Sequence, residues 1–277
     1  MCRLFGLTAG PARVPATFWL LDAPDSLVAE SHRNVDGSGI GFFDEPGLPV
    51  LDKQPEAAFQ DVSFRREARH ARSRTFVAHV RWATSGGRTV QNTHPFAMAG
   101  RIMAHNGGFG ELPLLEQQLG SYASMVQGDT DSERFFALIT QQIDAHDGDV
   151  GAGITAAAGW IAAHLPLTSL NTVVAAPGEL WALRYPDQHA LHILERPAVQ
   201  EELHVRSATS VVHAPDLSAG SIVIASEELD GETGWRMLAP GELVHITADL
   251  AVDSSVVLPD PPARLIPITG QNPNIDT

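Results

Sequence analysis

The sequence predicts an α+β fold in which antiparallel β-sheets carry helices on their outer faces. One observation is that many short apolar segments are interleaved with a few helical ones, without the βαβ rhythm of a parallel sheet. Another is that glycine and proline fall in short clusters, so that no linker divides the chain. We therefore expect a single domain over residues 2–265, followed by a polar C-terminal tail over residues 266–277.

The N-terminal half contains strand-like segments, rich in β-branched and aromatic residues, that alternate with helical material. The expected strands are residues 2–9, 37–43 and 75–83, and the apolar run that begins at residue 100 is expected to pass into a loop by residue 108. The expected helical segments are residues 16–21, 25–31 and the strongly charged stretch within 55–74.

The clearest helix start lies at Thr130. Glu133 follows it by three residues, which is the spacing of a capping box, so Asp131 is expected in the first helical turn. Four apolar residues then recur at helical spacing and predict one buried face. They are Phe135, Leu138, Ile139 and Ile143.

The C-terminal half predicts one more apolar helix, over residues 154–165, and a succession of short strands. Their number is what favours antiparallel sheets with helices outside them. The expected strands are residues 171–176, 180–185, 190–195, 221–226 and 242–247.

Composition excludes several classes of function. The formal net charge of −15 repels polyanions, so neither nucleic acid nor an anionic membrane surface is an expected partner. No apolar stretch approaches the roughly 20 residues of a membrane span, and glycine and proline interrupt the N-terminal residues that a signal peptide would need. A single cysteine cannot form an internal disulfide. We expect a cytoplasmic protein that acts on a small molecule or binds a protein.

The single cysteine, Cys2, lies one residue after the initiator methionine. It is either an accident at a tolerant chain end or a nucleophile. If Met1 is removed, the new α-amino group, with a pKa of about 7.7–8.0, lies within reach of the thiol and can act as its base. This chemistry needs no histidine partner.

Three other motifs supply groups that such a nucleophile requires. Asn106 and the glycine that follows it, Gly107, offer an amide and a backbone N–H for an oxyanion, although an Asn-Gly pair is also typical of a simple turn. Arg81 can bind a carboxylate in bidentate fashion, and Asp131 can accept from an ammonium group. Taken singly, Arg81 is equally consistent with a surface ion pair and Asp131 with a helix N-terminal acid.

No cofactor or metal ion is expected. The segment GSGIG lacks the third glycine and the βαβ context of a dinucleotide-binding loop. The histidines show no HExxH motif or other ligand-like spacing, so His79 and His105 are interpreted as packing residues near strand ends.

The motifs together resemble a class II glutamine amidotransferase, the glutaminase domain of the N-terminal-nucleophile type. The resemblance is dense up to about residue 143, and the second half is similar to stand-alone members such as the γ-glutamyl amidohydrolase of ergothioneine biosynthesis, with no synthase domain expected after it. The segments that carry it, in order, are MC, VDGSGIGFF, AHVRWATSGG, NTHPF, AHNGG and GDTDSE.

This resemblance implies a four-layer αββα sandwich of two antiparallel sheets and a role for each motif. Cys2 is the implied nucleophile, Asn106 and Gly107 the oxyanion hole, Arg81 the partner of the substrate α-carboxylate and Asp131 that of the α-amino group. Trp82 and Thr84 are implied to line the same pocket. Ser38 and Ser85 depart from the family pattern, in which tryptophan and histidine, respectively, are common. Both departures concern the side of the site that faces the acceptor and not the thiol chemistry.

The expected reaction is hydrolysis of the side-chain amide of glutamine or of another γ-glutamyl amide, through a γ-glutamyl thioester. A bile-salt or penicillin-type amidase also begins with a bared cysteine but does not need the pairing of Arg81 with Asp131. A catalytically idle or partner-dependent subunit of the same fold is the alternative from another class. A separate synthase subunit and self-association are left open as partners.

Overall fold

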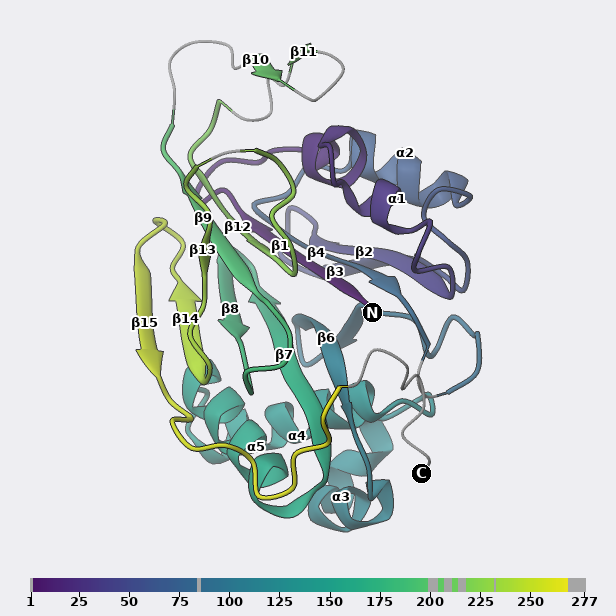
Figure 1. The fold of residues 1–277 in the computed structure, drawn as a ribbon, viewed down its shortest axis with the longest axis vertical. Helices are drawn as coiled ribbons and strands as arrows, with labels where there is room; N and C mark the ends of the chain where they lie inside the picture. The colour runs from purple at the N-terminus through teal and green to yellow at the C-terminus, as the bar shows by residue number, and fades with distance from the viewer. Residues whose placement is uncertain are drawn as a thin grey trace.

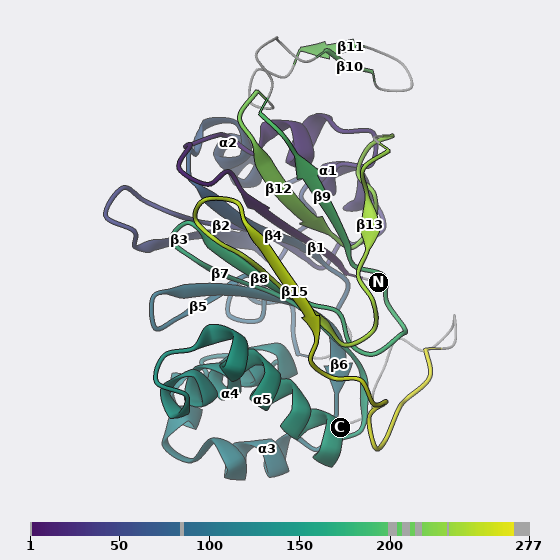
Figure 2. The same cartoon turned by 90° about the vertical axis from the view of Figure 1, so that its left-hand side faces the viewer.

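The computed structural model describes residues 2–83, 86–198, 204–206, 211–213, 218–231 and 233–268. Two β-sheets lie face to face in the middle, with helices α1 and α2 on one outer face and α3, α4 and α5 on the other (Figures 1 and 2). The expected four-layer αββα sandwich is confirmed.

One sheet has seven strands in the order β13-β9-β12-β1-β4-β2-β3, and every pairing in it is antiparallel. Its central strand β1 pairs with β4 and β12, two strands that are far apart in sequence. The strands are β1 (Arg3–Thr8), β2 (Gly37–Phe43), β3 (Pro49–Gln54), β4 (Thr75–Arg81), β9 (His192–Arg196), β12 (Ser221–Ala225) and β13 (Arg236–Met237).

The second sheet has six strands in the order β15-β14-β8-β7-β6-β5, again antiparallel throughout. Its strands are β5 (Phe96–Met98), β6 (Arg101–Phe109), β7 (Leu167–Ala176), β8 (Glu179–Leu183), β14 (Glu242–Ile246) and β15 (Val252–Val256). A separate hairpin joins β10 (His204–Arg206) and β11 (Val211–His213).

The helices fall into two groups. The first covers the seven-stranded sheet and the second the six-stranded one (Figure 2). None of the helices in the described part of the chain is long and apolar enough to cross a membrane. The first group is the short π-turn η1 (Phe18–Asp22), α1 (Leu27–Glu30) and α2 (Val62–His70). The second is α3 (Leu112–Leu119), the 3₁₀ turn η2 (Gly120–Met125), α4 (Asp131–Ala145) and α5 (Val150–His164).

Three apolar layers hold the four structural layers together. One lies between α2 with its neighbours and the seven-stranded sheet and includes Phe64 and Phe76. The middle layer lies between the two sheets, where Ile224 and Val173 pack in the same cluster. The third includes Phe135 and joins α4 and α5 to the six-stranded sheet. The inner strands of each sheet are therefore buried on both faces, which explains why β4 and β12 are buried at every position.

Most of the expected elements are present, and one expectation was wrong. The sequence predicted that residues near 108 form a loop, but Asn106, Gly107 and Gly108 continue strand β6 as far as Phe109. A Cβ on Gly107 would lie 1.8 Å from the carbonyl oxygen of Ser169, so glycine is required there by the close approach of β7 and not by a turn. Local sequence patterns also did not indicate α3, β3, β5, β10, β11, β13 or β15.

The start of α4 agrees with the capping prediction in part. The side chain of Thr130 accepts from the backbone N–H of Glu133 at 3.2 Å. The carboxylate of Glu133, however, accepts from the N–H groups of Gln127 and Gly128 at 3.1 and 2.7 Å. Glu133 therefore fastens the preceding loop onto the helix and does not close a reciprocal box. All four residues of the predicted apolar face are buried.

The expected C-terminal tail lies mostly outside the described residues. Its first residues are held by the domain, because the N–H of Ile266 donates to Leu167 at 2.8 Å and that of Ile268 to the side chain of Gln188 at 2.8 Å.

We predict that Gly153→Ala in α5 destabilises the protein, although alanine is the better helix former. A Cβ at Gly153 would lie 2.4 Å from Cγ1 and 2.8 Å from the backbone nitrogen of Ile143 in α4. Overpacking of this kind costs about 1–3 kcal/mol, which exceeds the ~1 kcal/mol that alanine contributes over glycine inside a helix. Denaturant unfolding measures the difference in the free energy of unfolding.

Gly159→Ala in the same helix is the matched control. A Cβ there would meet Leu258 at 3.6 Å, an ordinary van der Waals distance. The variant is expected to be neutral or more stable by up to about 1 kcal/mol. Equal stabilities of the two variants would contradict the packing of α5 on α4.

Candidate active site

Cys2 lies immediately before β1, where the N-terminal end of that strand meets the C-terminal end of β4. The thiol contacts the backbone of Trp82 on both sides: Sγ accepts from the N–H at 3.2 Å and donates to the carbonyl at 3.3 Å. Burial raises the pKa of the Cys2 thiol, and the hydrogen bond from Trp82 acts in the opposite direction. The thiol is therefore mostly protonated at neutral pH and needs a base to become a nucleophile.

Asn106 reaches Cys2 from the other sheet. It lies buried in β6, and its Nδ2 donates to the backbone carbonyl of Cys2 at 3.1 Å. This hydrogen bond joins residues that are 104 positions apart in the chain. An amide donor is thus placed beside the cysteine by the packing of one sheet on the other.

Gly107 directs its backbone away from β7. Leu170, which lies opposite Gly107, donates its own N–H to Tyr185 on the far side at 2.7 Å, so the two residues form a non-hydrogen-bonded pair of the antiparallel ladder. The Gly107 N–H therefore points toward the outer edge of β6, beyond β5, which pairs with residues 101–103. Phe109, two residues on, points its N–H the same way, onto the carboxylate of Asp131 at 3.2 Å.

Arg81 is the last residue of β4 and is almost fully buried. Its guanidinium donates to the carbonyl oxygens of Gly87 and Gly86 at 3.2 and 3.4 Å, so the loop after β4 folds back onto it. Burial lowers the pKa of Arg81, whereas the nearby charges of Cys2, Asp36 and Asp131 raise it. The positive charge of Arg81 in turn lowers the pKa of the Cys2 thiol.

Asp131 opens α4 and is held at the end of β6. Its carboxylate accepts from the N–H groups of Ser132 at 2.8 Å and of Phe109 at 3.2 Å. The cap at Thr130 sets the start of the helix and so the position of this side chain. The negative charge of Asp131 raises the pKa of the Cys2 thiol, which places both in one electrostatic environment.

The structure thus brings together the residues predicted from the sequence, with one exception. Thr84 lies outside the described residues, as does Ser85. Trp82 is 40% exposed, so its ring is at the surface and its backbone contacts the thiol. Ser38 donates to the carbonyl of Glu56 at 3.0 Å and to Asp61 at 3.2 Å, on the face of the sheet covered by α2.

Asp36, the second residue of the segment VDGSGIGFF, is a site residue that was not among those predicted from the sequence. It is buried, accepts from the N–H of Ala83 at 2.8 Å and forms an ion pair with Arg88. Its own N–H donates to the carbonyl of Arg81 at 3.0 Å. Asp36 therefore holds both ends of the turn that carries Arg81 and Trp82.

The buried histidines serve packing and orientation. His105 contacts Ser132 through Nδ1 at 2.9 Å and the carbonyl of Ser169 through Nε2 at 3.1 Å. Burial lowers the pKa of His79 to about 3, so that side chain is neutral at physiological pH. Within the described ranges, no group of three or more His, Cys, Asp or Glu side chains is arranged to hold a metal ion.

Comparisons with known proteins identify similar chains. A family model described as class-II glutamine amidotransferases matches residues 1–258. The γ-glutamyl-hercynylcysteine sulfoxide hydrolase of Mycobacterium tuberculosis is 28% identical over 89% of this chain and 93% of its own length. The protein of that name from Mycolicibacterium smegmatis is 27% identical over 89% of this chain and 96% of its own length. By contrast, the glutamine–fructose-6-phosphate aminotransferase of Xylella fastidiosa, 28% identical, is matched over 55% of this chain and 24% of its own length.

Solved structures support the fold. A class-II glutamine aminotransferase domain protein from Silicibacter pomeroyi aligns over 93% of this chain and 100% of its own, with a TM-score of 0.60 and 20% identity. The glutamine phosphoribosylpyrophosphate amidotransferase of B. subtilis aligns over 94% of this chain and 50% of its own, with a TM-score of 0.66 and 20% identity.

The pH dependence of alkylation tests the geometry without any assumption about activity. The chain has one cysteine, so alkylation reports on Cys2 alone. We predict that Arg81→Gln shifts the pH midpoint of alkylation upward and that Asp131→Asn shifts it downward, because the two charges act on the thiol with opposite sign. Glu45→Gln is the control.

Glu45 is exposed and follows β2 at the end opposite to Gly37, the residue that pairs with Arg81. Its substitution is expected to leave the midpoint in place. Shifts in the same direction for the Arg81 and Asp131 variants would contradict the assigned arrangement.

Proposed function

The chain belongs to the class II glutamine amidotransferases, and from this membership we propose that it hydrolyses the side-chain amide of glutamine or of another γ-glutamyl compound. The single observation that carries the proposal is the position of the only cysteine, between the amide of Asn106 and the opposite charges of Arg81 and Asp131. That set combines a nucleophile, an oxyanion donor and partners for an amino-acid head.

In the proposed first half-reaction, the Cys2 sulfur attacks the amide carbon of the γ-glutamyl group. Its proton passes to the α-amino group that removal of Met1 exposes, which supplies the base that the raised thiol pKa calls for. Nδ2 of Asn106 and the N–H of Gly107 donate to the oxyanion of the tetrahedral intermediate. The proton then moves to the leaving nitrogen, and ammonia or an amine departs from the thioester.

In the second half-reaction, water attacks the γ-glutamyl thioester. The α-amino group accepts a proton from the water, and the same two donors stabilise the second tetrahedral intermediate. Collapse of that intermediate breaks the bond between carbon and sulfur, returns the proton to Cys2 and releases glutamate.

Recognition of the amino-acid head is assigned to Arg81 and Asp131. A guanidinium fork suits an α-carboxylate, and a carboxylate held by backbone N–H groups suits an α-ammonium. Both side chains are buried, so each charge acts in a medium of lower dielectric than water. A bile-salt or penicillin-type amidase has no use for this pair of charges.

The relatives that match most of the chain are named as hydrolases of a γ-glutamyl compound. That name supports a hydrolase of a modified γ-glutamyl substrate as a second candidate beside a glutaminase. Release of glutamate from glutamine, γ-glutamyl peptides and γ-glutamyl amines separates the two candidates. The mass of the mature N-terminus tests the idle-subunit alternative, since retained Met1 would leave no amino group beside the thiol.

We predict that Cys2→Ala abolishes glutamate release while the protein still folds. Cys2 precedes β1 and is not part of the apolar layers, so its replacement removes little packing. Circular dichroism and the unfolding midpoint check the fold, and the release of glutamate checks the chemistry. Normal turnover by this variant would refute the role of Cys2.

Substitutions at the other three positions are expected to separate binding from catalysis. Loss of a charge-assisted hydrogen bond costs about 1.5–3 kcal/mol, so Arg81→Gln and Asp131→Asn should each lower kcat/KM by about tenfold or more, mainly through KM. Asn106→Ala should lower kcat by about a hundredfold with little change in KM, because its amide donates to the oxyanion and to the Cys2 carbonyl and is not assigned to the amino-acid head.

Steady-state release of glutamate by the three variants measures this division. An Asn106 variant that loses affinity at unchanged kcat, or Arg81 and Asp131 variants that lose kcat at unchanged KM, would show that the roles are assigned wrongly.

A further inference from the structure

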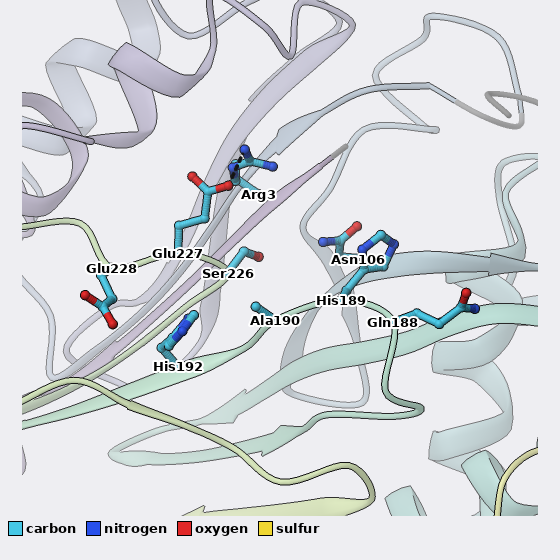
Figure 3. A pocket seen from close by; sticks show the side chains of 9 residues that line it. All are labelled: Arg3, Asn106, Gln188, His189, Ala190, His192, Ser226, Glu227 and Glu228. Carbon is cyan, nitrogen blue, oxygen red and sulfur yellow. Dashed lines mark ion pairs between the residues drawn. The ribbon is translucent and has the colours of Figure 1, made fainter. Parts of the chain in front are cut away.

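A cavity of about 460 Å³ lies beside Asn106, on the side of the Cys2 carbonyl (Figure 3). Two of its lining side chains hold that carbonyl: Arg3 donates to it at 3.4 Å and Asn106 at 3.1 Å. Among the described residues that line it, neither Arg81 nor Asp131 is present. The cavity therefore adjoins the candidate catalytic residues but is separate from the groups proposed to hold the glutamyl head.

Its walls come from strand ends that the seven-stranded sheet brings together. Strand β12 pairs with β1, and the pairing continues through Ser226, whose N–H donates to Leu4 at 3.1 Å and whose Oγ accepts from Leu4 at 2.9 Å. This register places Glu227 beside Arg3, and Glu228 follows it in the wall of the cavity. The segment Gln188–Ala190 and His192 of β9 complete the wall (Figure 3).

The cavity carries an excess of negative charge. Arg3 is paired twice, with Glu30 at 3.0 Å and with Glu227 at 2.5 Å. Figure 3 shows the pair with Glu227. Glu228 is exposed at the wall, and in the described part of the chain it has no ion-pair partner. The lining thus holds one guanidinium and two carboxylates, Glu227 and Glu228, and the guanidinium is also paired with Glu30, which lies outside the lining. A cation is the ligand that offsets the remaining negative charge.

Two imidazoles add ring nitrogens to the wall of the cavity. His189 is 7% exposed and lines the cavity, and its Nδ1 has no hydrogen-bond partner among the described residues; the same holds for Nδ1 of His192. Burial lowers the pKa of His189 to about 4, so this ring is neutral at physiological pH. A neutral imidazole has one acceptor nitrogen, which suits an N–H donor of a ligand. A buried polar atom without a partner also carries a free-energy cost that a bound donor would remove.

The cavity is larger than ammonia requires. A water molecule, similar in size to ammonia, takes up about 30 Å³ in the liquid, far less than the cavity volume. The space beyond the scissile bond therefore suits a leaving amine with several heavy atoms.

We propose that this cavity binds the leaving amine of a γ-glutamyl amide and that this amine bears a second, protonated amino group. The inference rests on the proposed function, because it assumes that the glutamyl head lies at Arg81 and Asp131. In this arrangement the substrate extends from the glutamyl head past Asn106 into the cavity. The ammonium group of the leaving amine then lies between Glu228 and the imidazoles of His189 and His192.

Two isosteric substrates test the proposal: γ-glutamyl-1,4-diaminobutane, which ends in an ammonium group, and γ-glutamyl-n-pentylamine, which ends in a methyl group. We expect kcat/KM of the native protein to favour the first by about tenfold. Glu228→Gln should lower this preference about threefold, as expected for an exposed ion pair, and Glu228→Lys should lower it further. Glu45→Gln and Glu45→Lys make the same charge changes at an exposed residue that follows β2, at the end of that strand away from Gly37 and Arg81. These two variants should leave the preference unchanged.

Failure of this inference differs from failure of the proposed function. Equal kcat/KM for the two amides, both in the native protein and in the Glu228 variants, would refute the cation site. It would leave the proposed γ-glutamyl hydrolase activity intact. Equal losses of preference in the Glu45 and Glu228 variants would also refute it, because they would reflect net charge alone. Absence of glutamate release from both amides and from glutamine would refute the proposed function and this inference with it.

Discussion

The packing of the two sheets against each other is the constraint on which the site depends. The sheets approach closely over β1: a Cβ on Gly6 would lie 2.9 Å from the side chains of both Leu180 and Val173 in the opposite sheet. Cys2 precedes β1 and Asn106 belongs to β6, so the 3.1 Å hydrogen bond between them exists because the sheets are in this one register. A slip of β1 by one residue against β4 and β12 would turn its side chains to the opposite face of the sheet.

The candidate site is also a set of buried polar groups whose positions are fixed by backbone contacts. The guanidinium of Arg81 is held by the carbonyls of Gly86 and Gly87, and Asp131 by the N–H groups of Phe109 and Ser132. Polar groups that are already oriented need little reorganisation when charge develops near them. Asp36 belongs to the same scheme, because it ties the two ends of the turn after β4.

Local sequence patterns predicted the elements that are long and apolar and failed where tertiary contacts decide the conformation. The four apolar residues of α4 and the strands β2, β4 and β12 follow from periodicity and composition alone. The Asn106-Gly107 pair suggested the end of a strand, since such a pair favours turns. In the structure, the carbonyl of Ser169 on β7 leaves no room for a side chain at Gly107, and the strand continues.

The sequence by itself determined which chemistry is available: one thiol near the chain start, an Asn-Gly pair, an arginine at a strand end and an aspartate behind a helix cap. The tertiary structure decided that these groups meet. It also placed Glu227 beside Arg3 and His189 beside Asn106 around one cavity, which no local pattern indicated. The physical reason is that the strand order β9-β12-β1-β4 joins segments separated by up to 222 positions in the chain. This strand order depends on which apolar faces pack together in three dimensions. The periodicity of the sequence shows which face of each strand or helix is apolar, but not which other face covers it.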